Sequence, residues 1–192
     1  MAAVKALAAV VLVFASALAA WGQGTLRFSN APNGVSGPNA PVHESDGVTK
    51  CSGPQFMADL LAGPSADSLS LIASTGFLTG NGAGYFFGGT ATVNTVAGGA
   101  TAWVQVDVWN TSSGASFQAA KVSGMPNSWW QSAIFTAVTG WTSINPAPPG
   151  SLDALGKSPV YLNSVPEPSA LALAGLGALL ALRKRLTSQG TE

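Results

Sequence analysis

The chain has 192 residues, 47% of them hydrophobic and only 8% charged, and its basic and acidic side chains balance to no formal net charge. A nucleic-acid-binding protein would show a basic patch, and a disordered chain would show high charge with few apolar residues; this composition matches neither class. The single cysteine, Cys51, excludes an intrachain disulfide and leaves two alternatives, burial as a small apolar side chain or an intermolecular bond.

The first 22 residues have the three parts of a secretory signal peptide. A short start with one cation, Lys5, precedes an apolar run at 6–18, and small residues follow. Cleavage is expected after Ala19 or after Gly22, and the second site lies just before the first expected strand. We therefore predict a signal helix in residues 1–22 and an exported mature chain.

Residues 23–145 are predicted to form an all-β domain, an antiparallel β-sandwich of about seven or eight short strands joined by Gly- and Pro-rich turns. The segment 55–62 suits either a strand, with Phe56, Ala58 and Leu60 facing inward, or a helical turn. The other short strands are expected at 25–29, on both sides of the Asp46-Gly47 turn, and at 68–73, 116–122 and 132–139.

The clearest expected strands are Tyr85–Thr95 and Thr101–Asn110, separated by the turn at 97–100. The second alternates small apolar residues at even positions with larger or polar residues at odd positions, which is typical of a half-buried antiparallel strand. The two strands are predicted to pair as a hairpin at the centre of the sheet.

No catalytic, metal or cofactor site is expected in this domain. His43, the single histidine, has no nucleophile elbow to serve, and with Cys51 it cannot supply three zinc ligands. The glycine-rich stretches lack the lysine and the strand-to-helix context of a phosphate-binding loop. The mature region 23–164 has one Glu and five Asp, and the sequence alone does not pair any of them for glycoside hydrolysis.

Tryptophans are the remaining candidates for a binding site. Trp103 and Trp109 share the strand face opposite the valines, where exposed rings could stack on sugars or meet a partner surface. The alternative is that loops cover this face and that both residues belong to the core.

Residues 146–164 are expected to form a linker, with one short strand at 159–162, and residues 165–188 form a separate C-terminal segment. Its uncharged run at 169–182 would make a helix about 21 Å long, shorter than the hydrocarbon core of about 30 Å. A basic cluster follows directly and would hold the C-terminus on the cytoplasmic side. The cluster comprises Arg183, Lys184 and Arg185. We predict a single transmembrane helix here.

The segment begins with Val165, Pro166, Glu167 and Pro168. A Pro-Glu-Pro motif, a short apolar run and a basic end at the C-terminus together resemble the PEP-CTERM sorting signal of Gram-negative bacteria. The segments "DGVTK…LLAGPSADSL", "GAGYFFGGTATV" and "GATAWVQVDVWN" also look like a domain of PEP-CTERM proteins from Verrucomicrobia. The resemblance implies processing by a membrane enzyme, exosortase, near the Pro-Glu-Pro motif, and a link to exopolysaccharide and biofilm.

The sequence therefore leads to two expectations about function. The first is an exported, non-enzymatic protein that passes through an inner-membrane-anchored intermediate to the cell surface or the extracellular matrix. The alternative is a carbohydrate-binding module that recognises extracellular polysaccharide through Trp103 and Trp109. No nucleic acid partner and no cofactor are expected in either case.

Overall fold

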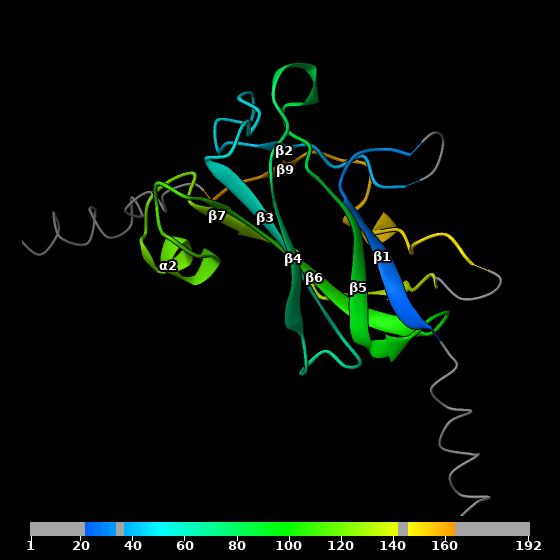
Figure 1. Cartoon of the computed structure of the whole chain (residues 1–192). Helices are drawn as coiled ribbons and strands as arrows, with labels where there is room; N and C mark the ends of the chain where they lie inside the picture. Colours follow the sequence, from blue (N-terminus) through cyan, green and yellow to red (C-terminus); the bar gives the residue numbers. More distant parts are fainter. Residues whose placement is uncertain (1–21, 34–36, 142–145, 164–192) are drawn as a thin grey trace, which may run out of the picture.

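The computed structural model describes residues 22–33, 37–141 and 146–163 (Figure 1). The domain is mostly β, as predicted, with one short α-helix. Its elements in chain order are β1 (Gln23–Ser29), β2 (Val42–His43), β3 (Phe56–Gly63), β4 (Ser70–Gly76), β5 (Phe87–Ala97), β6 (Thr101–Asn110), α2 (Phe117–Val122), β7 (Trp129–Gln131), β8 (Phe135–Val138) and β9 (Val160–Tyr161). Two 3₁₀ turns, Gly80–Gly82 and Asp153–Leu155, complete them.

The predicted signal helix falls outside the described residues except for Gly22, and the sorting segment 165–188 with its expected transmembrane helix falls outside them entirely. Within the described ranges, no helix has the length and apolar character needed to cross a membrane.

The strands form one large sheet and two small pairs. The large sheet has five strands in the order β4-β3-β6-β7, and β8 lies along the same edge of β6 as β7. Strand β1 pairs with β5 in a separate antiparallel pair. Strand β2 pairs with β9, and this pairing is parallel, which differs from the wholly antiparallel arrangement that the sequence predicted.

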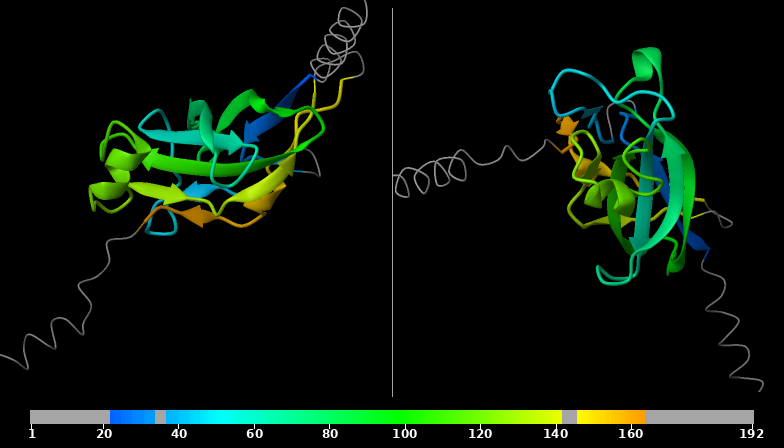
Figure 2. Two further views of the ribbon diagram at one scale, coloured as in Figure 1. Left: turned by 90° about the horizontal axis from the view of Figure 1, so that it is seen from below. Right: turned by 90° about the vertical axis from the view of Figure 1, so that its left-hand side faces the viewer.

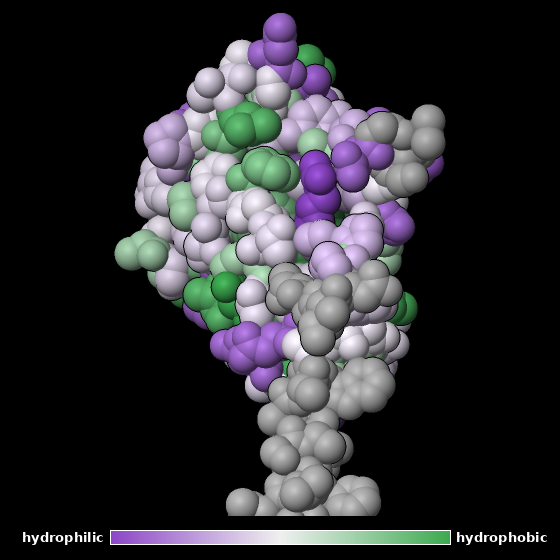
Figure 3. Space-filling model, turned by 45° about the vertical axis from the view of Figure 1, so that its right-hand side comes forward, coloured by the Kyte–Doolittle hydropathy of each residue, from purple (hydrophilic) through white to green (hydrophobic). Residues whose placement is uncertain are grey.

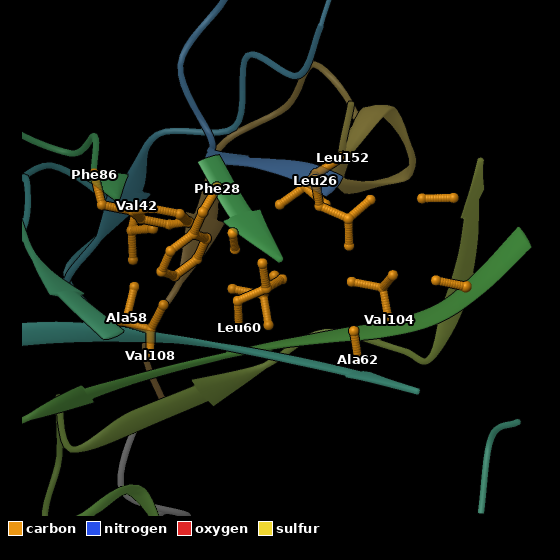
Figure 4. Close-up of a cluster of buried hydrophobic side chains, with 14 of the residues drawn as sticks. Leu26, Phe28, Val42, Ala58, Leu60, Ala62, Phe86, Val104, Val108 and Leu152 are labelled. Carbon is orange, nitrogen blue, oxygen red and sulfur yellow. The ribbon is translucent and has the colours of Figure 1, made fainter. Parts of the chain in front are cut away.

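The hydrophobic core lies between the large sheet and the elements that face it. In Figure 4, Ala58, Leu60 and Val104 point from the sheet toward side chains of β1 and of the segments after it. The facing side chains include Leu26, Phe28, Val42, Phe86 and Leu152, each no more than 1% exposed. The inward positions of β3 and β6 alternate with outward ones, so period-two patterning places one face of each strand in the core. Of the two alternatives for 55–62, this alternation confirms the strand, and the helical turn is wrong.

The predicted hairpin of β5 and β6 is wrong, because the two consecutive strands belong to different sheets. Residue Thr139 occupies the place where the hairpin would close. Its hydroxyl lies 3.0 Å from the carbonyl oxygen of Ala97 and 2.9 Å from that of Ala100, and its backbone accepts from Gly99 N. The turn is therefore held by a later segment of the chain, and β5 continues along β1.

The strand predicted at 116–122 is also wrong, because Phe117–Val122 forms the helix α2. Ser116 caps it, with its side-chain oxygen accepting from Ala119 N at 3.3 Å. Phe117 and Ala120, three residues apart, are the buried face of this short helix. Residues 118–121, Gln-Ala-Ala-Lys, are good helix formers, a signal that the strand assignment ignored.

The segment predicted as a linker, 146–164, is part of the domain as far as Asn163. The backbone of Gly150 bonds to both Thr25 and Arg27 of β1. Leu152 and Leu162 are 0% and 2% exposed in the core, and the short strand expected at 159–162 is present as β9. Proline and glycine content indicated a spacer here, whereas this segment in fact covers β1.

Candidate functional site

The face of the large sheet that points away from the core carries a line of polar side chains across four strands. Ser74 of β4 lies opposite Asp59 of β3, Asp59 lies opposite Asp107 of β6, and Asp107 lies opposite Gln131 of β7. We call these four residues the polar row. The strand register alone brings the two aspartates together, although they are far apart in the sequence.

Hydrogen bonds connect the polar row from one edge to the other. The Ser74 hydroxyl donates to Asp59 Oδ1, and Gln131 Nε2 donates to Asp107 Oδ1 at 2.9 Å. Lys121 Nζ of α2 donates in turn to Gln131 Oε1 at 2.9 Å. Each carboxylate therefore has a neutral hydrogen-bond donor, and the nearest cation reaches Asp107 only through an amide.

Burial changes the acidity of both aspartates. Asp107 is only 4% exposed, and the pKa of its carboxyl is raised to about 6. Desolvation is the largest cause and the nearby Asp59 carboxylate adds to it, while the Gln131 hydrogen bond and the Lys121 charge act in the opposite direction. Desolvation also raises the pKa of Asp59, against a hydrogen bond from Ser74 that lowers it. The pair can thus hold a proton at a higher pH than ordinary aspartates, and half-buried Asp59 is the member that solvent reaches.

The two tryptophans of the predicted binding face have different environments. Trp103 is 37% exposed, near the end of β6 that pairs with β8. Trp109 is only 6% exposed, so it cannot offer a ring face to a ligand in this conformation. Of the two alternatives that the sequence left open, the core location therefore applies to Trp109, and the exposed location applies to Trp103.

The helix α2 buries Trp109. Phe117, Ala120 and Trp109 form a small apolar cluster on the outer face, against which Trp129 is partly buried. Lys121 Nζ lies 4.8 Å from the ring centroid of Trp129, close enough for a cation–π contact. The indole N–H of Trp109 is buried and makes no hydrogen bond with any described group.

His43 and Cys51 do not form a site. His43 lies on β2 rather than in a solvated loop, and its ring packs on Tyr161 with centroids 5.8 Å apart. Cys51 is fully buried, so of the two alternatives for this residue the structure shows burial as a small apolar side chain. Burial raises the pKa of its thiol to about 12. Among the described side chains, no three of the His, Cys, Asp and Glu type gather closely enough to hold a metal ion.

The sequence contained only part of the information needed to find the polar row. Asp59 and Asp107 each stand at an outward position in a strand of alternating pattern, between two apolar residues, and a carboxylate is unusual in such a strand. Their pairing depends on the register of β3 on β6, which no local pattern specifies.

Comparison with known protein families identifies the C-terminal segment. The model of the PEP-CTERM protein-sorting motif matches residues 164–185. The chain carries a PEP-CTERM sorting motif. This motif indicates export, processing by an exosortase-type membrane enzyme, and membrane-associated sorting toward the cell surface. It includes all of the predicted motif residues, from Val165 to Pro168 and from Arg183 to Arg185, which lie outside the described structure.

The match covers the tail and leaves the β domain unassigned. The searches of curated proteins and of solved structures found no match to the chain. The predicted similarity of the domain to proteins of Verrucomicrobia stays a prediction.

Proposed function

We propose that the chain is an exported, non-enzymatic protein whose tail is processed by an exosortase-type enzyme and whose β domain, a β-sandwich, becomes part of the cell surface or of a biofilm matrix rich in exopolysaccharide. The observation that carries this proposal is the PEP-CTERM match at 164–185, at the C-terminal end of a folded domain. The β domain is the part that is exported, and the tail is the signal that directs its sorting.

The dimensions of the tail support a temporary anchor. An apolar run of 14 residues, 169–182, is about 21 Å long as a helix and would have to thin a bilayer with a core of about 30 Å. The basic residues at 183–185 would keep the C-terminus cytoplasmic and the domain outside. We therefore place the intermediate in the inner membrane, before the motif is processed and the domain is released or retained at the surface.

The environment of the two aspartates supports a structural role for the polar row rather than a catalytic one. Asp107 is buried and bonded to Gln131, so its carboxylate is not presented to a substrate. Asp59 is bonded to Ser74 across the sheet. Both side chains accept a hydrogen bond from a neighbouring strand and so link the strands of the sheet.

The C-terminal end of the mature protein tests the proposal. The full chain would be expressed in a bacterium that has an exosortase and in the same strain lacking it, and the exported protein would be analysed by mass spectrometry. We expect the peptide containing Arg183–Arg185 to be missing only when exosortase is present. Replacing Pro166, Glu167 and Pro168 together with Ala should preserve that peptide.

A matched control is Thr187→Ala with Ser188→Ala, which changes residues beyond the matched motif. This variant should be processed like the wild type. An intact C-terminus on exported wild-type protein would contradict the proposal.

A second candidate function is binding of extracellular polysaccharide, and the exposure of Trp103 favours it. An exposed indole on a sheet face, with the amide of half-buried Gln105 two residues away, combines an apolar stacking surface with hydrogen-bonding groups suited to a sugar. Trp109 no longer takes part in this proposal because it is buried.

Binding to a glycan array tests this candidate. We expect Trp103→Ala to abolish binding while the far-UV circular dichroism spectrum stays unchanged. Phe87→Ala is the control, since Phe87 is 50% exposed on β5, in a different sheet. Equal binding by both variants would exclude Trp103 as the stacking residue.

A further inference from the structure

The described fold ends immediately before the sorting motif. Asn163 donates its backbone N–H to Trp129 O and accepts from Asn127 N, both at 2.9 Å. Its side chain accepts from the backbone N–H of Ser128 and of Trp129 and donates to Met125 O, each at 2.9 Å. The domain is therefore tied down up to residue 163, and the matched motif begins at 164.

This leaves little chain between the domain and the apolar run that starts at Ser169. The six steps along the chain from Asn163 to Ser169 span at most about 20 Å when fully extended, at about 3.3–3.6 Å each. The headgroup layer occupies about 5–8 Å of that length on one side of a bilayer. Once the run has entered the membrane, the end of the domain at Asn163 can lie no more than about 12–15 Å above the headgroup layer.

The exit of the chain is surrounded by exposed apolar side chains. Val122 and Val48 are the two most exposed large apolar residues of the described structure, at 82% and 79%, and Met125 and Tyr161 are about half exposed. We call these four residues the exit rim. Scattered single apolar residues on a surface are ordinary, whereas four around one point of chain exit are a reason to look for a partner.

Contacts between the loops place the exit rim at one end of the domain. Ser45 N donates to Asn127 Oδ1 at 2.6 Å, which ties the turn carrying Val48 to the loop carrying Met125. Tyr161 lies against the same turn, beside Gly47, and two residues before the exit. Figure 2 shows α2, the turn after β2 and the C-terminal end of β9 at the same end, opposite the start of β1.

Other exposed apolar side chains of the described structure lie away from the chain exit, among them Leu71 on β4, Phe87 on β5 and Val138 on β8. On the face seen in Figure 3, apolar side chains form separate small patches among strongly and weakly polar ones. The exit rim is thus distinguished by its position at the chain exit and by containing the two most exposed of these residues, Val122 and Val48.

We infer that the exit rim docks on the lipid surface into which the PEP-CTERM tail inserts, so that the domain lies on the membrane in a fixed orientation until it is processed. This inference rests on the proposed function, because the tail brings the surface to the lipid. Tyr161 suits the interfacial zone, where aromatic side chains with a polar tip are preferred. Glu44 and Asp46 lie in the turn at 44–49, and Lys50 and Lys121 lie beside the exit rim, so neither sign of charge dominates and a zwitterionic lipid suffices.

Depth-dependent quenching in vesicles tests the inference. The full chain would be reconstituted into phosphatidylcholine vesicles after an environment-sensitive fluorophore is attached at Val48→Cys or at Val122→Cys. A lipid with a nitroxide in the upper acyl chain would then be added. We expect loss of fluorescence at both positions. Wild-type protein controls for Cys51, whose burial and raised pKa should prevent labelling.

The matched control position is Val138→Cys. Val138 is 63% exposed on β8 and lies opposite Thr101, whereas the exit lies beside Trp129, opposite Trp109. Eight residues of strand separate the two places, about 26 Å. The label at 138 should keep its fluorescence.

Two failures can be told apart by vesicle flotation. If the chain floats with the vesicles but the labels at 48 and 122 behave like the label at 138, the docking inference is wrong and the proposed function stands. If the full chain does not float, the tail does not anchor it, and both the docking and the membrane step of the proposed function are wrong.

Discussion

The two faces of the large sheet are built from alternate residues of the same strands, and they are stabilised in different ways. The inner face consists of small and branched apolar side chains, of which Leu60, Val104 and Val106 are fully buried. The outer face carries the polar row, and α2 covers only the part that contains Trp109. The inner face therefore depends on apolar packing, whereas the outer face depends on matched hydrogen bonds and on one short helix.

The largest expected effect comes from placing a charge on the inner face. Val106→Asp would bury an unpaired carboxylate among the core side chains, and we expect it to prevent folding, because such a charge costs several kcal/mol against a total stability of about 5–15 kcal/mol. Thr101→Asp, at an exposed outward position of the same strand, should fold and lose no more than about 1 kcal/mol. Circular dichroism and urea unfolding would measure both variants. A folded Val106→Asp would show that the inner face tolerates charge.

The second prediction compares the covered and the open parts of the outer face. Trp109→Ala should lower the free energy of unfolding by about 3–5 kcal/mol, since it removes the centre of the cluster under α2. Trp103→Ala, at a position with a partly exposed ring, should cost about 1 kcal/mol or less. Urea unfolding followed by far-UV circular dichroism measures the difference. Equal costs would mean that α2 adds no packing energy to the outer face.

The sequence predicted well what depends on local pattern. Strand β6 was predicted with its observed bounds, and the strands at 25–29 and 159–162 were found nearly in place, because alternation and turn residues are local signals. The sequence-based predictions failed where segments that are distant in the chain compete for the same backbone hydrogen bonds. Thr139 takes the hydrogen bonds at the turn after β5, and only the folded chain brings that residue there. The pairing of Asp59 with Asp107 was missed for the same reason.

The third prediction concerns the dependence of stability on pH, which comes from the carboxylates of the outer face and not from the apolar inner face. The pKa of Asp107 is raised from an unfolded value of about 3.9 to about 6, so folding favours the protonated carboxyl. The stability that this group contributes is fully present below about pH 3.9 and is lost as pH rises through about 6, with a total loss of at most about 3 kcal/mol. Burial also raises the pKa of Asp59, so its ionisation lowers the stability in the same direction as the pH rises.

Asp107→Asn should remove most of this dependence, because its amide oxygen can still accept from Gln131 while carrying no charge. Urea unfolding between pH 4 and pH 8 would measure it, and the variant should be more stable than the wild type at pH 8. Asp67→Asn, in the exposed turn between β3 and β4, is the control and should keep the wild-type profile. If the wild type instead gained stability from pH 4 to pH 8 and Asp107→Asn removed that gain, folding would lower rather than raise the pKa of Asp107.

The smallest expected effect connects α2 to the polar row. Lys121→Met keeps the apolar stem and removes the charge, so it loses the hydrogen bond to Gln131 and the contact with the Trp129 ring. We expect a cost of about 1 kcal/mol. The Lys121 charge also lowers the pKa of Asp107, so the loss should be greater at pH 8, where Asp107 is ionised, than at pH 4.

A double-mutant cycle separates these two contributions. In the Asp107→Asn background, the cost of Lys121→Met should be the same at pH 4 and at pH 8, because the charge that it would stabilise is gone. Lys157→Met, at an exposed position just before β9, controls for the loss of a positive charge in general. A cost that stays larger at pH 8 in the double variant would assign the pH dependence to Asp59. In that case the polar row, rather than Asp107 alone, would be the unit that responds to pH.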